Sequence, residues 1–187
     1  MGTHEQEFDR IRPFLDRATR LFLLPKKVDL RGGGNFVREG PNIIIGNHCG
    51  SYQDVSILLR NVPRMIYFTA NQMIFTREGA SELVLRHLRR HMGTLGGFVH
   101  VILRPFYNFM VDYISGHIAA IGTIPVDIYG SKRESIIKCQ DYLTKGRAVI
   151  ALQGRGRVHP KEPHPYVKEF RRGASIMAYN LRRESGL

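Results

Sequence analysis

A histidine and an aspartate that could work together follow a short apolar run in IIIGNHCGSYQDVSILL, residues 43–59. His48 and Asp54 have five residues between them. A histidine beside a carboxylate can serve as a general base, because the acid orients the imidazole and stabilises its charged form. The same stretch also fits an ordinary helix start, with Ser51 as N-cap and Asp54 in the first turn. The spacing alone leaves both interpretations open.

The segments around this pair alternate between strand-like and helix-like patterns. Continuous β-branched runs at 42–46 and 148–152 are typical of strands buried on both faces of a sheet. Further strands are predicted at 64–69 and 122–128, where Pro125 favours an edge or irregular position. Helices are predicted after Asp54, at 82–91, at 131–145 and from Ala174 onward. We therefore predict an α/β fold, with a central, mostly parallel or mixed β-sheet flanked by helices.

Composition favours one domain over residues 1–187 and an anionic partner. The chain has 187 residues, of which 43% are hydrophobic, enough for one sizeable core. Its 28 Lys and Arg against 16 acidic residues give a net charge of +12, which favours nucleic acid, anionic lipid or a phosphorylated substrate. The two cysteines, Cys49 and Cys139, form no CxxC pair, so a reducing compartment fits best.

The N-terminal region, residues 1–25, predicts a basic amphipathic helix. Apolar residues recur at helical spacing at Phe8, Ile11, Phe14, Leu15, Ala18, Leu21 and Phe22. Such a helix can lie in a membrane interface, or it can pack on the core of its own domain. The polar start MGTHEQEFDR is unlike a signal peptide, and no apolar run reaches the roughly 18 residues that a membrane span needs.

Three motif blocks, taken in order, resemble the glycerolipid acyltransferase family, which includes the lysophosphatidate acyltransferases. The first family block, N-H-x-S-x-x-D, is matched by Asn47, His48, Ser51 and Asp54. The second, roughly G-x-I-P-V-D-R, is matched in GTIPVDI by Gly122, Ile124, Pro125, Val126 and Asp127. The third, F-P-E-G-T-R-S followed by a basic-Gly-Ala run, is matched by Gly154, Phe170, Gly173 and Ala174. The resemblance covers about 25–185.

Each block also departs from the family pattern. The first has one extra residue, Ile128 replaces the second-block arginine, and Gln153 replaces the third-block glutamate. The family uses these charged groups to hold the phosphate of the acceptor. Nearby basic residues are candidates to replace them, and solvated surface positions are the alternative for each. The substrate-binding residues that we predict are Asn47, Ser51, Gly122, Lys132, Arg133, Gln153, Gly154, Arg155 and Arg157, with Arg171 and Arg172 as further cationic candidates.

The resemblance implies an O-acyltransferase of phospholipid biosynthesis that acts at the cytoplasmic side of a membrane as a peripheral protein. His48 would take a proton from a hydroxyl of a lysophospholipid or glycerol phosphate, which attacks an acyl thioester on coenzyme A or acyl carrier protein. Asp54 would orient the imidazole, and no metal or other cofactor is implied. The family continues into another strand where this chain stops, so the resemblance implies a C-terminally incomplete domain, or one completed in a way that the sequence does not show.

Two other functions remain open. One is a non-catalytic relative that binds anionic lipid, and the other is a basic nucleic-acid-binding protein, although no nucleic acid is expected under the acyltransferase interpretation. A zinc site at His87 and His91 is less favoured than solvated histidines, because Leu88 stands where a zinc protease has glutamate. The glycine-rich GTLGGF at 93–98 predicts a turn.

The extra residue of the first block makes a geometric prediction. The S-x-x-D half of the block is intact, so the insertion falls in Cys49-Gly50. Glycine reaches φ > 0 at little cost, which makes Gly50 the residue best able to absorb a bulge. We predict that a bulge restores the pairing, with the His48 nitrogen and the Asp54 oxygen within about 3.2 Å or bridged by one water.

Overall fold

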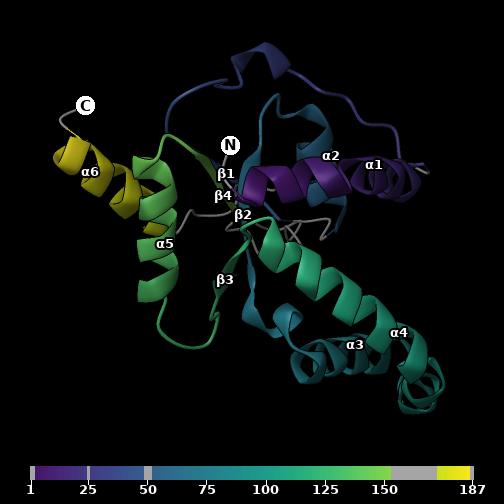
Figure 1. Ribbon diagram of the computed structural model, residues 1–187. Helices are drawn as coiled ribbons and strands as arrows, with labels where there is room; N and C mark the ends of the chain where they lie inside the picture. Colours follow the sequence, from purple (N-terminus) through teal and green to yellow (C-terminus); the bar gives the residue numbers. More distant parts are fainter. Residues whose placement is uncertain (1–2, 25, 49–51, 153–171, 186–187) are drawn as a thin grey trace, which may run out of the picture.

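The computed structural model describes residues 3–24, 26–48, 52–152 and 172–185. It contains a four-stranded sheet with helices on both faces (Figure 1). All strand pairs are parallel, which confirms the predicted α/β class and narrows the sheet to the parallel type. A parallel sheet requires a crossover between neighbouring strands, and the helices provide these connections.

The strands lie in the order β1-β4-β2-β3. Their bounds are β1 Asn42–Gly46, β2 Ile66–Asn71, β3 Ile124–Val126 and β4 Ala148–Leu152. The predictions at 42–46 and 148–152 match these bounds, whereas β2 is shifted by two residues and β3 is shorter than predicted. Pro125 lies in β3, and β3 is an edge strand, as predicted, where a missing N–H is tolerated.

The helices and short 3₁₀ turns complete the chain. The α-helices are α1 Thr3–Leu23, α2 Tyr52–Asn61, α3 Arg77–Met92, α4 Leu95–Ala120, α5 Arg133–Thr144 and α6 Gly173–Ser185. The 3₁₀ turns are η1 Gly33–Asn35 and η2 Gln72–Phe75. None of the helices in the described ranges is long and apolar enough to cross a membrane.

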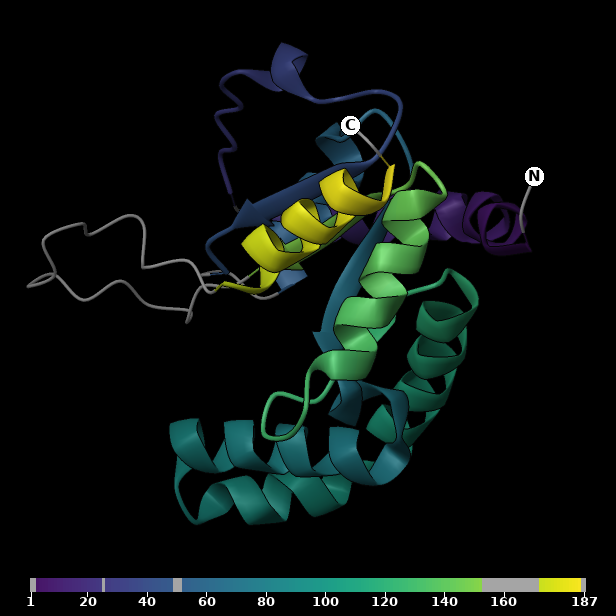
Figure 2. The ribbon, with the colours of Figure 1, turned by 90° about the vertical axis from the view of Figure 1, so that its left-hand side faces the viewer.

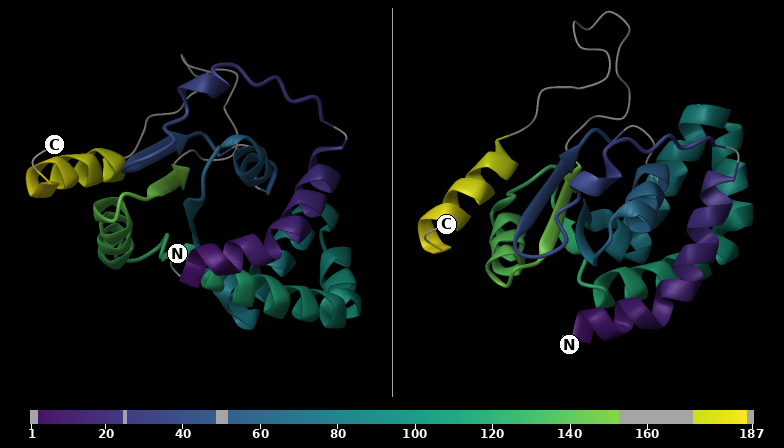
Figure 3. Two further views of the ribbon diagram at one scale, coloured as in Figure 1. Left: turned by 45° about the horizontal axis from the view of Figure 1, so that its top comes forward. Right: turned by 90° about the horizontal axis from the view of Figure 1, so that it is seen from above.

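The core has one layer on each face of the sheet. Tyr67, Val149 and Ala151 point to the face that α5 and α6 cover, where they pack with Leu143 and Met177. The alternate positions of the same strands point to the other face, which α2 covers: Ile66, Phe68, Ala148 and Ile150, with Val62 behind them. Figure 3 shows the sheet between these helices. Burial on both faces accounts for the continuous apolar runs in the strands.

The α1 helix begins at Thr3 and packs against α2 and α4. Ile11 and Leu23 are buried, so part of the N-terminal apolar stripe belongs to the protein's own packing. Phe14 and Leu21, however, are exposed. Pro13 lies inside the helix rather than at its start. The helix therefore divides its apolar side chains between the protein and solvent.

The α3–α4 hairpin between β2 and β3 extends away from α5 and α6 (Figure 2). The predicted turn at 93–98 is wrong in part, because α4 already begins at Leu95. Only Gly93, with φ of 58°, and Thr94 separate the two helices. Gly96 lies inside α4, where a Cβ atom would stand 2.6 Å from the backbone of Leu88. The missing side chain lets the two helices approach closely.

Candidate active site

The carboxyl end of β1 presents the first-block residues. β1 ends at Gly46, and Asn47 and His48 follow it directly, before α2 begins at Tyr52. Open parallel sheets bind ligands beyond the carboxyl ends of their strands, because the loops there leave backbone and side-chain groups accessible. Asn47 is half-buried in this position.

His48 and Asp54 are paired. His48 Nδ1 lies 3.1 Å from Asp54 Oδ2, a normal hydrogen-bond distance. Asp54 lies in the first turn of α2, and its side chain is 23% exposed, whereas that of His48 is 37% exposed. This confirms the predicted pairing. The bulge predicted at Cys49-Gly50 lies outside the described residues.

The pair has a geometry suited to general-base chemistry. If Nδ1 carries a proton, it donates to Asp54, and Nε2 keeps its lone pair for an incoming proton. A carboxylate in this position also stabilises the imidazolium that forms when Nε2 is protonated. Because His48 remains partly exposed, a substrate hydroxyl can approach its ring.

Several predicted substrate-binding residues lie outside the described part of the chain. These are Ser51, Gln153, Gly154, Arg155 and Arg157, together with Arg171. The described chain of β4 ends at Leu152, which pairs in register with Gly46 of β1. Arg172, at the start of the next described range, is exposed.

Gly122 is not brought to the pair. It precedes β3 in a left-handed conformation, with φ of 77°, and a Cβ atom there would lie 2.8 Å from the hydroxyl of Tyr142 and from the ring of Tyr67. Both Tyr67 of β2 and Ile43 of β1 pair in register with Val149 of β4, which lies between these strands. Ile43 is five positions before His48. At about 3.3 Å per residue, Gly122 is thus roughly 16 Å from His48 along the strand direction. Its observed role is to form a tight turn beneath two stacked tyrosines.

The second-block acid also has a local structural role. Asp127 follows β3, and its Oδ1 accepts hydrogen bonds from the backbone N–H groups of Tyr129 and Gly130, at 2.9 and 2.8 Å. These hydrogen bonds lower the pKa of Asp127 below its ordinary value, and the one from Gly130 has the larger effect. The carboxylate thereby shapes the loop that leads to α5.

Lys132 and Arg133 lie at the end of this loop, at the start of α5, and both are exposed. They share the carboxyl edge of the sheet with His48. β3 is nevertheless three strand positions from β1, which corresponds to roughly 14 Å at the usual strand spacing. Any ligand that touches both regions must span that distance.

A second histidine contact connects the two helices of the hairpin. Ser81 Oγ on α3 lies 3.2 Å from His100 Nε2 on α4. No spacing rule in the sequence indicates this pair, because it depends on how α3 packs on α4. We assign it a packing role. His87 and His91, considered above for zinc, lie on α3, and their side chains are outside those described. Elsewhere in the described ranges, no group of three or more His, Cys, Asp and Glu residues is placed to hold a metal ion.

Comparisons with family models, with curated proteins and with solved structures find no match to this chain.

Proposed function

We propose that the protein is an O-acyltransferase of the glycerolipid type, which transfers an acyl group from a thioester to the hydroxyl of a lysophospholipid or glycerol phosphate. The observation that carries this proposal is the 3.1 Å contact of His48 Nδ1 with Asp54 Oδ2 at the carboxyl end of a parallel strand. The three motif blocks, in their family order, support the choice of reaction.

In the proposed reaction, His48 acts as the general base. Asp54 accepts the Nδ1 proton and so holds the imidazole in the tautomer whose Nε2 is free. Nε2 removes the proton from the acceptor hydroxyl as its oxygen attacks the carbonyl carbon of the thioester. A carbon–oxygen bond forms, and the carbonyl π electrons move onto oxygen.

The tetrahedral intermediate then collapses, and the carbon–sulfur bond breaks. The thiolate of coenzyme A or acyl carrier protein leaves with the electron pair of that bond. The imidazolium of His48 then gives its proton to the sulfur, which forms the thiol. The products are an ester and a free thiol, and His48 is neutral again. Neither an acyl-enzyme nor an added oxidant or reductant is required.

The acceptor phosphate has two cationic candidates among the described residues. Lys132 and Arg133 are exposed on the same edge of the sheet as His48, on the loop that Asp127 shapes. Because they are about three strand spacings away, they suit a phosphate at the far end of an extended acceptor better than one next to the reacting hydroxyl.

A thiol-release assay tests the proposal. Acyl-coenzyme A and acyl carrier protein donors are combined with a panel of lysophospholipids and glycerol phosphate, and free thiol is followed with a chromogenic disulfide. We expect His48→Ala to lower turnover by about 10² to 10⁴-fold, the usual contribution of a positioned base. The matched control is His117→Ala, because His117 lies on α4, where its Nδ1 is 2.7 Å from the carbonyl oxygen of Tyr113 in the same helix.

The possible outcomes separate the candidate functions. Unchanged turnover in a folded His48→Ala protein would contradict the mechanism. If the parent protein releases no thiol with any donor and acceptor, yet binds anionic lipid, the non-catalytic relative becomes the better description. Ile128 and Gln153, which replace charged residues of the family blocks, are the sequence features that favour this second candidate.

A further inference from the structure

The outward face of α4 carries exposed apolar side chains at helical spacing. They recur every three or four positions and form a row that we call the α4 stripe: Leu95, Phe98, Ile102, Phe106, Phe109 and Tyr113. The three phenylalanines are 66 to 72% exposed. At 1.5 Å per residue, the row is about 27 Å long. A contiguous apolar surface of this kind marks an interaction site more often than a solvated one.

Positions outside the stripe pack on α3 at the two ends of α4, whereas residues 101–106 between them are exposed. Gly96 lies against the backbone of Leu88, and His100 contacts Ser81. Farther along, the Arg77 guanidinium forms an ion pair with Asp112. These contacts hold α4 on α3, so the stripe is presented in a fixed orientation and is not needed for the hairpin itself.

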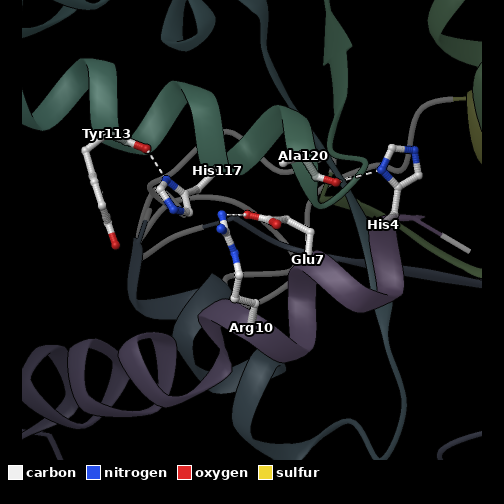
Figure 4. A network of polar contacts seen from close by, with 6 residues as sticks. All are labelled: His4, Glu7, Arg10, Tyr113, His117 and Ala120. Atoms are coloured by element: carbon white, nitrogen blue, oxygen red, sulfur yellow. Dashed lines mark hydrogen bonds and ion pairs between the residues drawn. The ribbon is translucent and has the colours of Figure 1, made fainter.

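The α4 stripe continues onto α1. The ring of Tyr113 contacts that of Phe14 edge to face, with centroids 5.5 Å apart, and Phe14 is itself 51% exposed. The start of α1 is tied to the end of α4, because His4 Nδ1 lies 2.6 Å from the carbonyl oxygen of Ala120 (Figure 4). Phe14 therefore belongs to the same surface as the α4 stripe.

Charge on the hairpin identifies the partner. The 29 residues 83–111 contain four arginines and no acidic residue. Arg86 forms an ion pair with Glu82, and helical spacing puts Arg104 on the side of α4 away from the stripe. The excess charge nearest the stripe in sequence therefore comes from Arg89 and Arg90. Arg89 and Arg90 are exposed in the last turn of α3, close in sequence to the first residues of the stripe. A cationic rim beside an apolar aromatic row complements an anionic headgroup layer above hydrocarbon.

We propose that the α4 stripe, with Phe14 of α1, docks the protein onto an anionic lipid bilayer. The helix lies along the membrane surface, with its phenylalanines among the acyl chains and with Arg89 and Arg90 of α3 at the headgroups. A second copy of this chain is a poorer occupant, because it would bring the same cationic rims together. Docking through the α4 stripe and Phe14 does not depend on the chemistry of His48.

Tryptophan fluorescence tests the docking directly, because the chain contains no tryptophan. Phe109→Trp places a reporter in the stripe, and Tyr179→Trp, on the exposed surface of α6, is the matched control. With vesicles of phosphatidylcholine and phosphatidylglycerol in equal amounts, we expect the Phe109→Trp emission to shift to shorter wavelength. Brominated lipid chains should then quench it, whereas Tyr179→Trp should change in neither respect.

Sedimentation with the same vesicles measures what the stripe contributes to binding. The combined variant Phe98→Gln, Phe106→Gln, Phe109→Gln is expected to bind at least about tenfold more weakly. The control, Ile137→Gln, Ile176→Gln, Tyr179→Gln, removes exposed apolar groups from α5 and α6 and should bind like the parent. The variant Arg89→Gln, Arg90→Gln should weaken binding to the anionic vesicles about tenfold or more, and this loss should disappear at high salt.

Other results of these experiments would contradict docking on a bilayer or assign the stripe to a second copy of the chain. A Phe109→Trp emission that vesicles leave unchanged, or a triple Phe variant that binds like the parent, would overturn the docking. Light scattering that shows a dimeric parent and a monomeric triple variant would assign the stripe to a second copy instead. Since His48→Ala should keep full vesicle binding, a failure of catalysis is distinguishable from a failure of docking.

Discussion

The sheet and the α3–α4 hairpin place their large apolar side chains in opposite surroundings. In the sheet, Val149 and Ile150 are fully enclosed, because helices cover both faces. In the hairpin, α3 covers only one side of α4, and Phe98 and Phe109 are among its most exposed side chains. Apolar side chains of the sheet therefore stabilise the fold, whereas those of the α4 stripe are available to contact a partner.

The largest expected contrast is in the free energy of unfolding. Ile150→Ala should destabilise the protein by about 2–5 kcal/mol, because it removes packed methyl groups and leaves a cavity between the sheet and α2. Phe109→Ala should change the same quantity by no more than about 0.5 kcal/mol, because its ring is already in water. Urea unfolding followed by circular dichroism measures both. A large loss of unfolding free energy in Phe109→Ala would show that the stripe stabilises the fold, in contradiction to this prediction.

A smaller contrast lies within the hairpin, at two adjacent glycines of α4. A methyl group on Gly96 would meet the Leu88 backbone at 2.6 Å, whereas one on Gly97 meets nothing within 4 Å. Gly96→Ala should therefore destabilise the protein by about 1–3 kcal/mol through overpacking. Gly97→Ala should stabilise it by about 0.5–1 kcal/mol, the usual gain of alanine over glycine in a helix. Equal effects in urea unfolding would argue against the close approach of α3 and α4.

A third prediction concerns how the free energy of unfolding changes with pH through the thiol of Cys139, which packs in the core beneath α5 and α6. Burial raises its pKa from the ordinary value of 9.0 to about 11. Its contribution to stability is therefore fully present below about pH 9 and lost as the pH rises toward 11, because the unfolded chain releases the proton more readily.

Thiol labelling checks this and extends the comparison between the two regions. In a Cys49→Ser background, Cys139 should react slowly with iodoacetamide at neutral and mildly alkaline pH, because it is buried and protonated. Phe109→Cys in the same background places a thiol in the α4 stripe, which should react much faster. Rapid labelling of Cys139 in folded protein would mean that the core opens readily.

Local patterns in the sequence were enough to predict several parts of this protein. Continuous β-branched runs placed β1 and β4 at their observed bounds, and the predicted edge position of Pro125 is confirmed. The pairing of His48 with Asp54 also followed from the sequence. His48 follows β1 and Asp54 lies in the first turn of α2, six positions later, so few backbone paths join them.

Which residues meet across the fold, and which helix faces stay exposed, depends instead on packing between distant segments. The whole of α4 was missed. Glycines normally indicate a turn at its start, yet Gly96 is helical and packs on Leu88. The strand order β1-β4-β2-β3 separates Lys132 and Arg133 from His48, and the register moves Gly122 away from it. Helical periodicity likewise predicts an apolar face but cannot say whether another element covers it. That depends on packing between segments distant in sequence, which left the α4 stripe exposed.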